Sequence, residues 1–287
     1  MLQIARLSPK LLGDSCELVE SFVRSQINPD GAFRNRAGKS DLYYTVFGLE
    51  TLVALQVRPP VDEVAAYLRT LGDGAGLDFV HLACLARCWA GVTRNLSEVP
   101  ARAILGRIEA FRTPDGGYNQ SKGAAHGSAY AAYLAMEAYQ DLGGSLPRLE
   151  GLIASLHCLR SGDGAYSNFP GAAAGVTTAT AAVVSLMRQW QQDPDAALAV
   201  WLRARFLPGG GFLAVPSAPI PDLLSTATAL HALSGLHAPL DELREPCLDF
   251  IDSLWTNRGG FYGHWSDDAI DTEYTFYALL SLGHLTE

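Results

Sequence analysis

The sequence predicts an all-α fold, an α6/α6 toroid (a double helical barrel) in which a ring of inner helices is surrounded by a ring of outer helices. Three observations predict it: a repeated glycine turn, a regular spacing of apolar segments, and a difference in polarity between the two helices of each repeat. Internal repeats of roughly 20 to 50 residues are typical of proteins built from stacked helical units. The chain contains no linker longer than a loop, so we expect a single domain over residues 1–287.

A glycine-containing turn followed by an aromatic residue recurs along the chain. The clear copies read Asp30-Gly31-Ala32-Phe33, Asp115-Gly116-Gly117-Tyr118, Asp163-Gly164-Ala165-Tyr166, Gly209-Gly210-Gly211-Phe212 and Arg258-Gly259-Gly260-Phe261. A further copy, Asp73-Gly74-Ala75-Gly76, lacks the aromatic residue. We expect a left-handed glycine to end each outer helix, and the aromatic ring to be buried under the loop that follows.

A strongly apolar segment follows each turn and predicts an inner helix. These segments begin near Asp41, Asp78, His126, Ala174, Asp222 and Asp271, at intervals of 37, 48, 48, 48 and 49 residues. The first interval is short because Gly76 lies two residues before Asp78, whereas Phe33 lies eight residues before Asp41. A helix that is apolar nearly all round, such as residues 225–230, must be covered on both sides.

The segments before the turns are amphipathic and predict outer helices. In residues 61–68 the charged side chains share one face, as in a helix that is half exposed to solvent. The last apolar segment continues to Leu285 without the polar capping repeat that an open solenoid needs. We therefore expect the helix pairs to close into a ring.

Charge and composition exclude several classes of function. The net charge of −9 disfavours a nucleic-acid backbone as partner. No stretch approaches the length of apolar sequence that spans a membrane, and residues 1–6 do not resemble the start of a signal peptide. Five scattered cysteines do not suggest a disulfide framework, so we expect a cytoplasmic protein.

A ligand site is expected where the N-termini of the inner helices meet. Helix N-termini carry partial positive charge, so this rim would suit an anionic group above an apolar pit. An Asp-x-x-x-Thr pattern opens several inner segments: Asp41 to Thr45, Asp222 to Thr226 and Asp271 to Thr275. Each of these aspartates is predicted to cap its helix.

An acidic cluster lies close to the start of the last inner segment. Its members are Asp267, Asp268, Asp271 and Glu273. Carboxylates this close repel one another unless a cation sits among them or some are protonated. The cluster therefore predicts magnesium bound by the three aspartates, or an acid of raised pKa at Glu273; a solvated acidic loop is the alternative.

Aromatic residues on the inner segments are candidates to line the pit around a long apolar ligand or a cation. The candidates are Tyr44, Phe47, Tyr130, Tyr274 and Tyr277, with Tyr43, Phe79, Tyr133 and Phe276. His126, at the head of an inner segment, and Trp265, in a loop near the mouth, are further ligand-binding candidates. Cys84 and Cys88 share a helical face with His81, but they lie among Leu and Ala, where cysteine is usually a small core residue.

The turns, the period near 48 residues and the apolar inner segments together resemble one superfamily over about residues 14–287. This superfamily unites protein prenyltransferase β subunits with class II terpene cyclases, and the resemblance implies an isoprenoid cavity. The resemblance to the prenyltransferases also implies zinc, bound by an Asp-x-Cys segment and the histidine of Asp-x-x-His-Thr. Here Leu224 and Tyr274 stand at the cysteine and histidine positions, so that zinc site is not expected.

The cyclase branch of the resemblance implies an Asp-x-Asp-Asp-Thr motif, whose middle aspartate protonates the isoprenoid. The similar segment Asp271-Thr272-Glu273-Tyr274-Thr275 places Glu273 at the acid position. Asp222 aligns with the first aspartate of a second copy, in which Leu224 replaces the acid. Residues 267–271 also spell the Asp-Asp-x-x-Asp with which class I terpene synthases bind magnesium diphosphate.

These features predict an isoprenoid enzyme, either a single-barrel cyclase or a divergent prenyltransferase acting on an isoprenoid diphosphate or related lipid. Its catalytic candidates are Glu273, Asp271 and Asp222. One alternative is a non-catalytic protein that carries lipid or binds a helical partner subunit. Another is a carbohydrate-active α/α-barrel enzyme, which would line its pit with tryptophan and acids.

Overall fold

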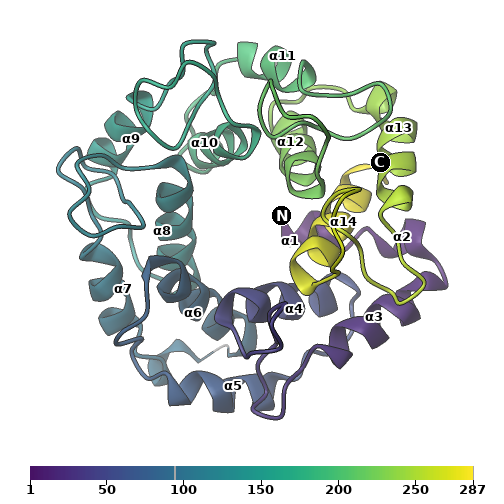
Figure 1. Ribbon diagram of the computed structural model, residues 1–287. Coiled ribbons are helices and arrows are strands. Elements are labelled where there is room, and N and C mark those ends of the chain that lie inside the picture. Colours follow the sequence, from purple (N-terminus) through teal and green to yellow (C-terminus); the bar gives the residue numbers. More distant parts are fainter. Residues whose placement is uncertain (94, 287) are drawn as a thin grey trace.

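A closed double ring of helices forms the molecule (Figure 1). The computed structural model describes residues 1–93 and 95–286, apart from the side chain of Glu98. Within these residues the inner helices are α4 (Leu42–Ala54), α6 (Phe79–Val92), α8 (Ala129–Asp141), α10 (Thr177–Gln189), α12 (Leu223–Gly235) and α14 (Thr272–His284). The outer helices are α3 (Ser15–Ser25), α5 (Val61–Thr70), α7 (Ala101–Glu109), α9 (Leu149–His157), α11 (Ala197–Arg203) and α13 (Asp241–Ser253). The predicted α6/α6 toroid is confirmed.

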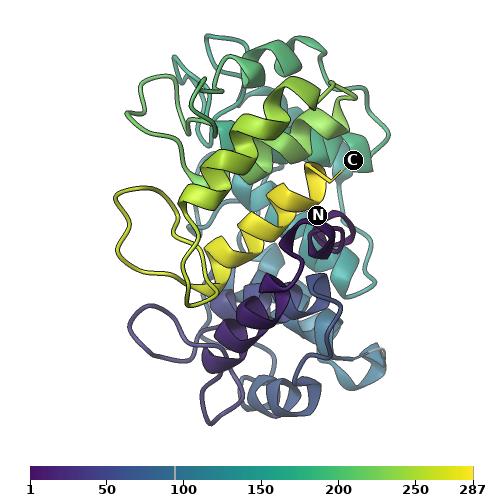
Figure 2. The ribbon, with the colours of Figure 1, turned by 90° about the vertical axis from the view of Figure 1, so that its right-hand side faces the viewer.

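The ring is closed by contacts between consecutive inner helices. Each inner helix packs against the next, and α14 packs against α4, which begins the inner ring. The loops that lead into the inner helices project from one side of the ring, and the two ends of the chain lie at the other (Figure 2). None of the helices in the described residues has the length and apolar character needed to cross a bilayer.

The glycine turns differ in position from the expectation. Helix α7 ends at Glu109, whereas Gly116 lies several residues later, in a tight turn between the bridged residues Arg112 and Tyr118. Gly116 is left-handed, with φ of 93°, and a Cβ atom there would lie 2.7 Å from the carbonyl oxygen of Gly151 on α9. The glycine therefore shapes a hairpin beside the next outer helix and does not cap its own. The aromatic Tyr118 is fully buried, as predicted.

Two copies of the Asp-x-x-x-Thr pattern join a hairpin to the inner helix that follows. Asp41 caps α4 by accepting a hydrogen bond from the Tyr43 amide. One turn later, the Thr45 hydroxyl accepts a hydrogen bond of 3.0 Å from the amide of Phe33 in the hairpin. Thr226 does the same for Phe212, at 2.9 Å. The threonine thus satisfies a buried amide that would otherwise lack a partner.

Two inner helices begin two residues later than predicted. Ser128 caps α8, and Val176 precedes α10, where the sequence suggested starts near His126 and Ala174. The amide of Gly127 instead donates to the Asp115 carboxylate of the preceding turn. This bond holds the residues before Ser128 in the hairpin, so His126 does not head an inner helix.

A short helix covers the end of the ring opposite the loops. Helix α1 (Leu2–Ala5) packs against α14 and α4, and α2 (Pro9–Leu12) connects it to α3. The approach to α14 is close, since a Cβ atom on Gly283 would lie 2.1 Å from the Ile4 carbonyl oxygen. The outer layer also contains a single 3₁₀ turn in the described residues, η1 (Leu96–Glu98).

Candidate functional site

A cavity of about 240 Å³ lies inside the inner ring. Its wall combines aromatic, aliphatic and a few charged side chains from several inner helices. The lining residues are Met1, Tyr43, Val46, Phe47, Glu50, Ala83, Cys84, Arg87, Tyr130, Tyr133, Leu134, Glu137, Asn168, Thr178, Ala179, Ala181, Ala182, Leu224, Thr228, Phe276 and Tyr277. Ligand pockets usually measure roughly 300 to 1,000 Å³, so this cavity suits a small or slender ligand.

Glu273 lies beside this cavity, in the first turn of α14. The hydroxyl of Tyr43, which lines the cavity, donates a hydrogen bond of 2.6 Å to the Glu273 carboxylate. Burial raises the pKa of Glu273 from its ordinary 4.5 to about 7, although the Tyr43 hydrogen bond acts in the opposite direction. Burial therefore favours the protonated form of Glu273, which is one of the alternatives predicted from the sequence.

Aromatic rings form the wall next to Tyr43. The ring of Phe47 lies 5.0 Å from that of Tyr43 and 5.4 Å from that of Tyr277. Burial is also the main cause that raises the pKa of the Tyr130 and Tyr277 hydroxyls, and the nearby Glu273 carboxylate contributes. These predicted residues, Phe47, Tyr130 and Tyr277, therefore line the cavity close to the acid.

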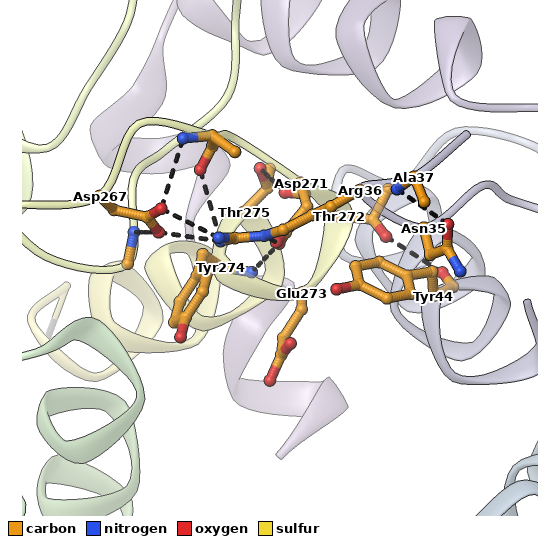
Figure 3. A network of polar contacts seen from close by, with 12 residues as sticks. Asn35, Arg36, Ala37, Tyr44, Asp267, Asp271, Thr272, Glu273, Tyr274 and Thr275 are labelled. Carbon is orange, nitrogen blue, oxygen red and sulfur yellow. Dashed lines mark hydrogen bonds and ion pairs between the residues drawn. The ribbon is translucent and has the colours of Figure 1, made fainter. Parts of the chain in front are cut away.

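The acidic loop before α14 holds an arginine. Arg36, from the loop before α4, donates to both carboxylate oxygens of Asp267, at 2.9 and 2.8 Å, and to Asp271, at 2.7 Å. Figure 3 shows this arrangement, with Glu273 pointing away from the guanidinium. Bonds to Asp267 and Asp271 raise the pKa of Arg36, so it stays charged. Sequence reasoning missed Arg36, which lies more than 200 residues from its partners in the chain.

The predicted magnesium ligands do not fit a divalent cation in this arrangement. The oxygens of Asp267 and Asp271 that such a cation would need already accept hydrogen bonds from Arg36, and Asp268 is exposed. Across the described residues, no group of three or more His, Cys, Asp and Glu side chains is arranged to hold a metal ion. The repulsion among the aspartates is relieved by a guanidinium, so the cluster itself gives no reason to invoke a metal.

The first residues of the Asp-x-x-x-Thr segments are helix caps. Asp222 accepts hydrogen bonds from the amide and the hydroxyl of Ser225, each 2.7 Å long. Asp271 is 4% exposed and accepts from the Tyr274 amide at 2.9 Å, in addition to its bond with Arg36. Both aspartates therefore cap their helices, and their catalytic role stays a prediction.

The other predicted ligand-binding residues lie outside the cavity wall. His126 is exposed, and its ring lies 3.6 Å from the Asp115 carboxylate. Trp265 is 51% exposed, and it packs against Phe250 and donates to Ser253, both on the outer helix α13. Tyr44 and Tyr274 lie near Arg36 (Figure 3), and the Arg36 guanidinium lies 5.4 Å from the Tyr274 ring.

Sequence reasoning also missed a charged cluster inside the inner ring. Arg87 on α6 donates to Glu50 on α4 and to Glu137 on α8, and the three side chains line the cavity. The sequence contained a signal for this cluster, because each of these charged residues interrupts an otherwise apolar segment. Charged residues are rarely buried without a partner, so lone charges in such segments predict contact with one another.

The family follows from comparison with known proteins. A family model described as the prenyltransferase alpha-alpha toroid domain matches residues 10–212 and residues 182–287. The chain belongs to the prenyltransferase α/α-toroid family. No curated protein sequence matches this family member.

Solved structures share the toroid fold of this family member at low sequence identity. A variant of the type II terpene cyclase MstE from Scytonema, without ligand, has a TM-score of 0.68 and 12% identity, over 97% of each chain. Another MstE variant, in complex with geranylgeranyl dihydroxybenzoate (substrate), has a TM-score of 0.66 and 13% identity, over 97% of each chain. At such identities the likeness is one of fold.

Proposed function

We propose that this protein is an isoprenoid cyclase in which Glu273 is the general acid. The observation that carries the proposal is a carboxyl group of raised pKa, bonded to Tyr43 beside a cavity with aromatic walls. A general acid works best when its pKa lies near the working pH. Because the Tyr43 hydroxyl donates to Oε1, Oε2 is the oxygen left to carry the proton.

The reaction would begin with transfer of that proton to one carbon of a C=C bond in the isoprenoid. The π electrons form the new C–H bond, the neighbouring carbon becomes cationic, and Glu273 is left as a carboxylate. Attack by further C=C bonds on the cation closes rings. Loss of a proton from the last cation then forms a C=C bond and gives a cyclic isomer of the substrate, and Glu273 takes up a proton from solvent before the next turnover. The faces of Phe47, Tyr130 and Tyr277 would stabilise the positive charge as it moves, since aromatic faces attract cations.

The pairing of Arg36 favours a reaction that starts with protonation over one that starts with loss of diphosphate. Arg36 is already paired with Asp267 and Asp271, so it is not free to bind a diphosphate group. The cavity wall also argues against the carbohydrate alternative, because no tryptophan of the described residues contributes to it. Binding of a helical partner subunit stays a prediction.

The test compares the wild type with Glu273→Gln on geranylgeranyl dihydroxybenzoate, the substrate of the structurally similar cyclase, and on farnesyl and geranylgeranyl diphosphates. We expect cyclic isomers of a substrate, detected by mass spectrometry, with the wild type and not with Glu273→Gln. Tyr44→Phe, which removes a hydroxyl from a residue outside the cavity wall, serves as an active control. Undiminished turnover by Glu273→Gln would contradict the assigned acid, and binding of unchanged substrate by both proteins would indicate a carrier.

A further inference from the structure

The charged cluster of Glu50, Arg87 and Glu137 lies at the end of the cavity away from Glu273. Tyr43 and Glu50 both line the cavity from α4, seven residues apart, which is about 10 Å along a helix that rises 1.5 Å per residue. The three side chains are well covered, with exposures of 12% for Glu50, 24% for Arg87 and 16% for Glu137. The cavity therefore has two polar ends, with an aromatic wall between them.

Negative charge predominates at this second end. One guanidinium, that of Arg87, faces the carboxylates of Glu50 and Glu137. One turn beyond Glu137 lies Asp141, whose buried Oδ2 has no hydrogen-bond partner among the described residues; burial raises the pKa of this carboxyl group to about 7, so it adds only part of a negative charge. The amino group of Met1 also faces these carboxylates, but burial lowers its pKa and so favours the uncharged amine.

We propose that this end of the cavity is a cation subsite, in which Glu50 and Glu137 stabilise positive charge at the end of the bound chain far from Glu273. Electrostatic interactions are stronger at such a buried position than in water, and Arg87 holds both carboxylates in fixed positions. The catalytic meaning of the subsite rests on the proposed function. Protonation beside Glu273 drives positive charge along the bound isoprenoid, and the subsite lies at the end that this charge reaches.

A tertiary ammonium is a stable stand-in for a tertiary carbocation, so alkyl amines test the subsite without turnover. The probes are N,N-dimethyldecylamine, 1-decanol and decanoate, titrated calorimetrically below their aggregation concentrations at neutral pH. We expect the wild type to bind the amine roughly ten-fold more tightly than the alcohol, as for one charge-assisted interaction. Glu50→Gln and Glu137→Gln should each remove most of this preference and leave the affinity for 1-decanol unchanged.

Several outcomes would overturn the subsite. These are equal affinities for the amine and the alcohol, a preference for decanoate through Arg87, or no binding of any probe by the wild type. Loss of amine affinity in Glu273→Gln instead of the Glu50 and Glu137 variants would place the charge at the other end. The comparison of probes in the wild type needs no variant, and circular dichroism checks that each variant folds. Since binding is measured without turnover, failure of the subsite and failure of the proposed cyclase activity are distinguished.

Discussion

The Tyr43 hydroxyl and the Glu273 carboxylate are joined by a 2.6 Å hydrogen bond across 230 residues of sequence. Tyr43 lies in α4, which begins the inner ring, and Glu273 lies in α14, which ends it. The bond therefore forms only when the ring is closed. Burial of Glu273 in the closed ring is also what raises its pKa, so the proposed acid depends on closure of the ring.

Glu273→Gln should stabilise the protein at alkaline pH. The folded-state pKa of Glu273, about 7, is above its ordinary value of 4.5. The folded protein therefore binds this proton more tightly than the unfolded chain does, and the wild type loses stability as pH rises from about 4.5 to 7. We expect the variant to be more stable than the wild type by up to about 3 kcal/mol at pH 8, and equal to it at pH 4. Urea unfolding at both pH values measures this, and a constant difference would contradict the raised pKa.

Tyr43→Phe should raise the pKa of Glu273 further. The Tyr43 hydroxyl stabilises the ionised carboxylate, so its removal leaves burial unopposed by that bond. We expect a rise of about one pH unit in the midpoint of the Glu273 carboxyl infrared band, and activity that persists to correspondingly higher pH. Tyr44→Phe, on the same helix, is the matched control and should leave the midpoint in place. A midpoint that falls in Tyr43→Phe would show that the hydroxyl favours the protonated acid.

Asp222→Ala should lower stability without abolishing activity. Loss of an N-cap side chain costs about 1 kcal/mol, and the Ser225 amide at the start of α12 would lose its acceptor. Asp222→Asn retains an acceptor oxygen and should unfold like the wild type. Denaturant unfolding and turnover are measured together. Complete loss of turnover in a folded Asp222→Asn protein would restore this residue to the catalytic set that the sequence suggested.

Arg36→Ala should expose the repulsion that Arg36 relieves. Removing the guanidinium leaves the buried Asp271 beside Asp267 without a cation, and we expect a loss of about 2 kcal/mol. Magnesium should raise the Tm of this variant and have little effect on the wild type, in which Arg36 holds the same oxygens. A magnesium-dependent rise of equal size in the wild type would favour the metal site predicted from the sequence.

Gly283→Ala should disrupt the contact between α1 and the inner ring. The added methyl group would meet the Ile4 carbonyl oxygen at 2.1 Å, so α1 must move, and overpacking of this kind costs about 1 to 3 kcal/mol. Gly106 lies within α7 with no atom near its would-be Cβ. Gly106→Ala should therefore stabilise the protein by about 0.5 to 1 kcal/mol. Equal effects of the two variants on Tm would contradict the close packing of α1.

The sequence predicted the aromatic wall from the apolar inner segments, and it predicted capping residues where a single segment carries the pattern. The segment from Asp271 to Thr275 identified both a capping aspartate and Glu273, because caps and motifs depend on neighbours in sequence. The same reasoning wrongly placed His126 at the head of a helix, because the hairpin bond from Gly127 to Asp115 was not foreseen. It also proposed a metal for Asp267 and Asp271, whose partner Arg36 comes from the other end of the chain.

By itself, the sequence determined the toroid. Its turns, caps and apolar periods recur locally in every pair of helices, and a helix apolar on all sides has to be enclosed. The tertiary structure alone decided which charges meet. Ring closure brings Tyr43 to Glu273 and Arg36 to Asp271, and the packing of α4, α6 and α8 gathers Glu50, Arg87 and Glu137. Such pairings depend on distance and burial in the closed ring, and these follow from packing between segments far apart in the chain.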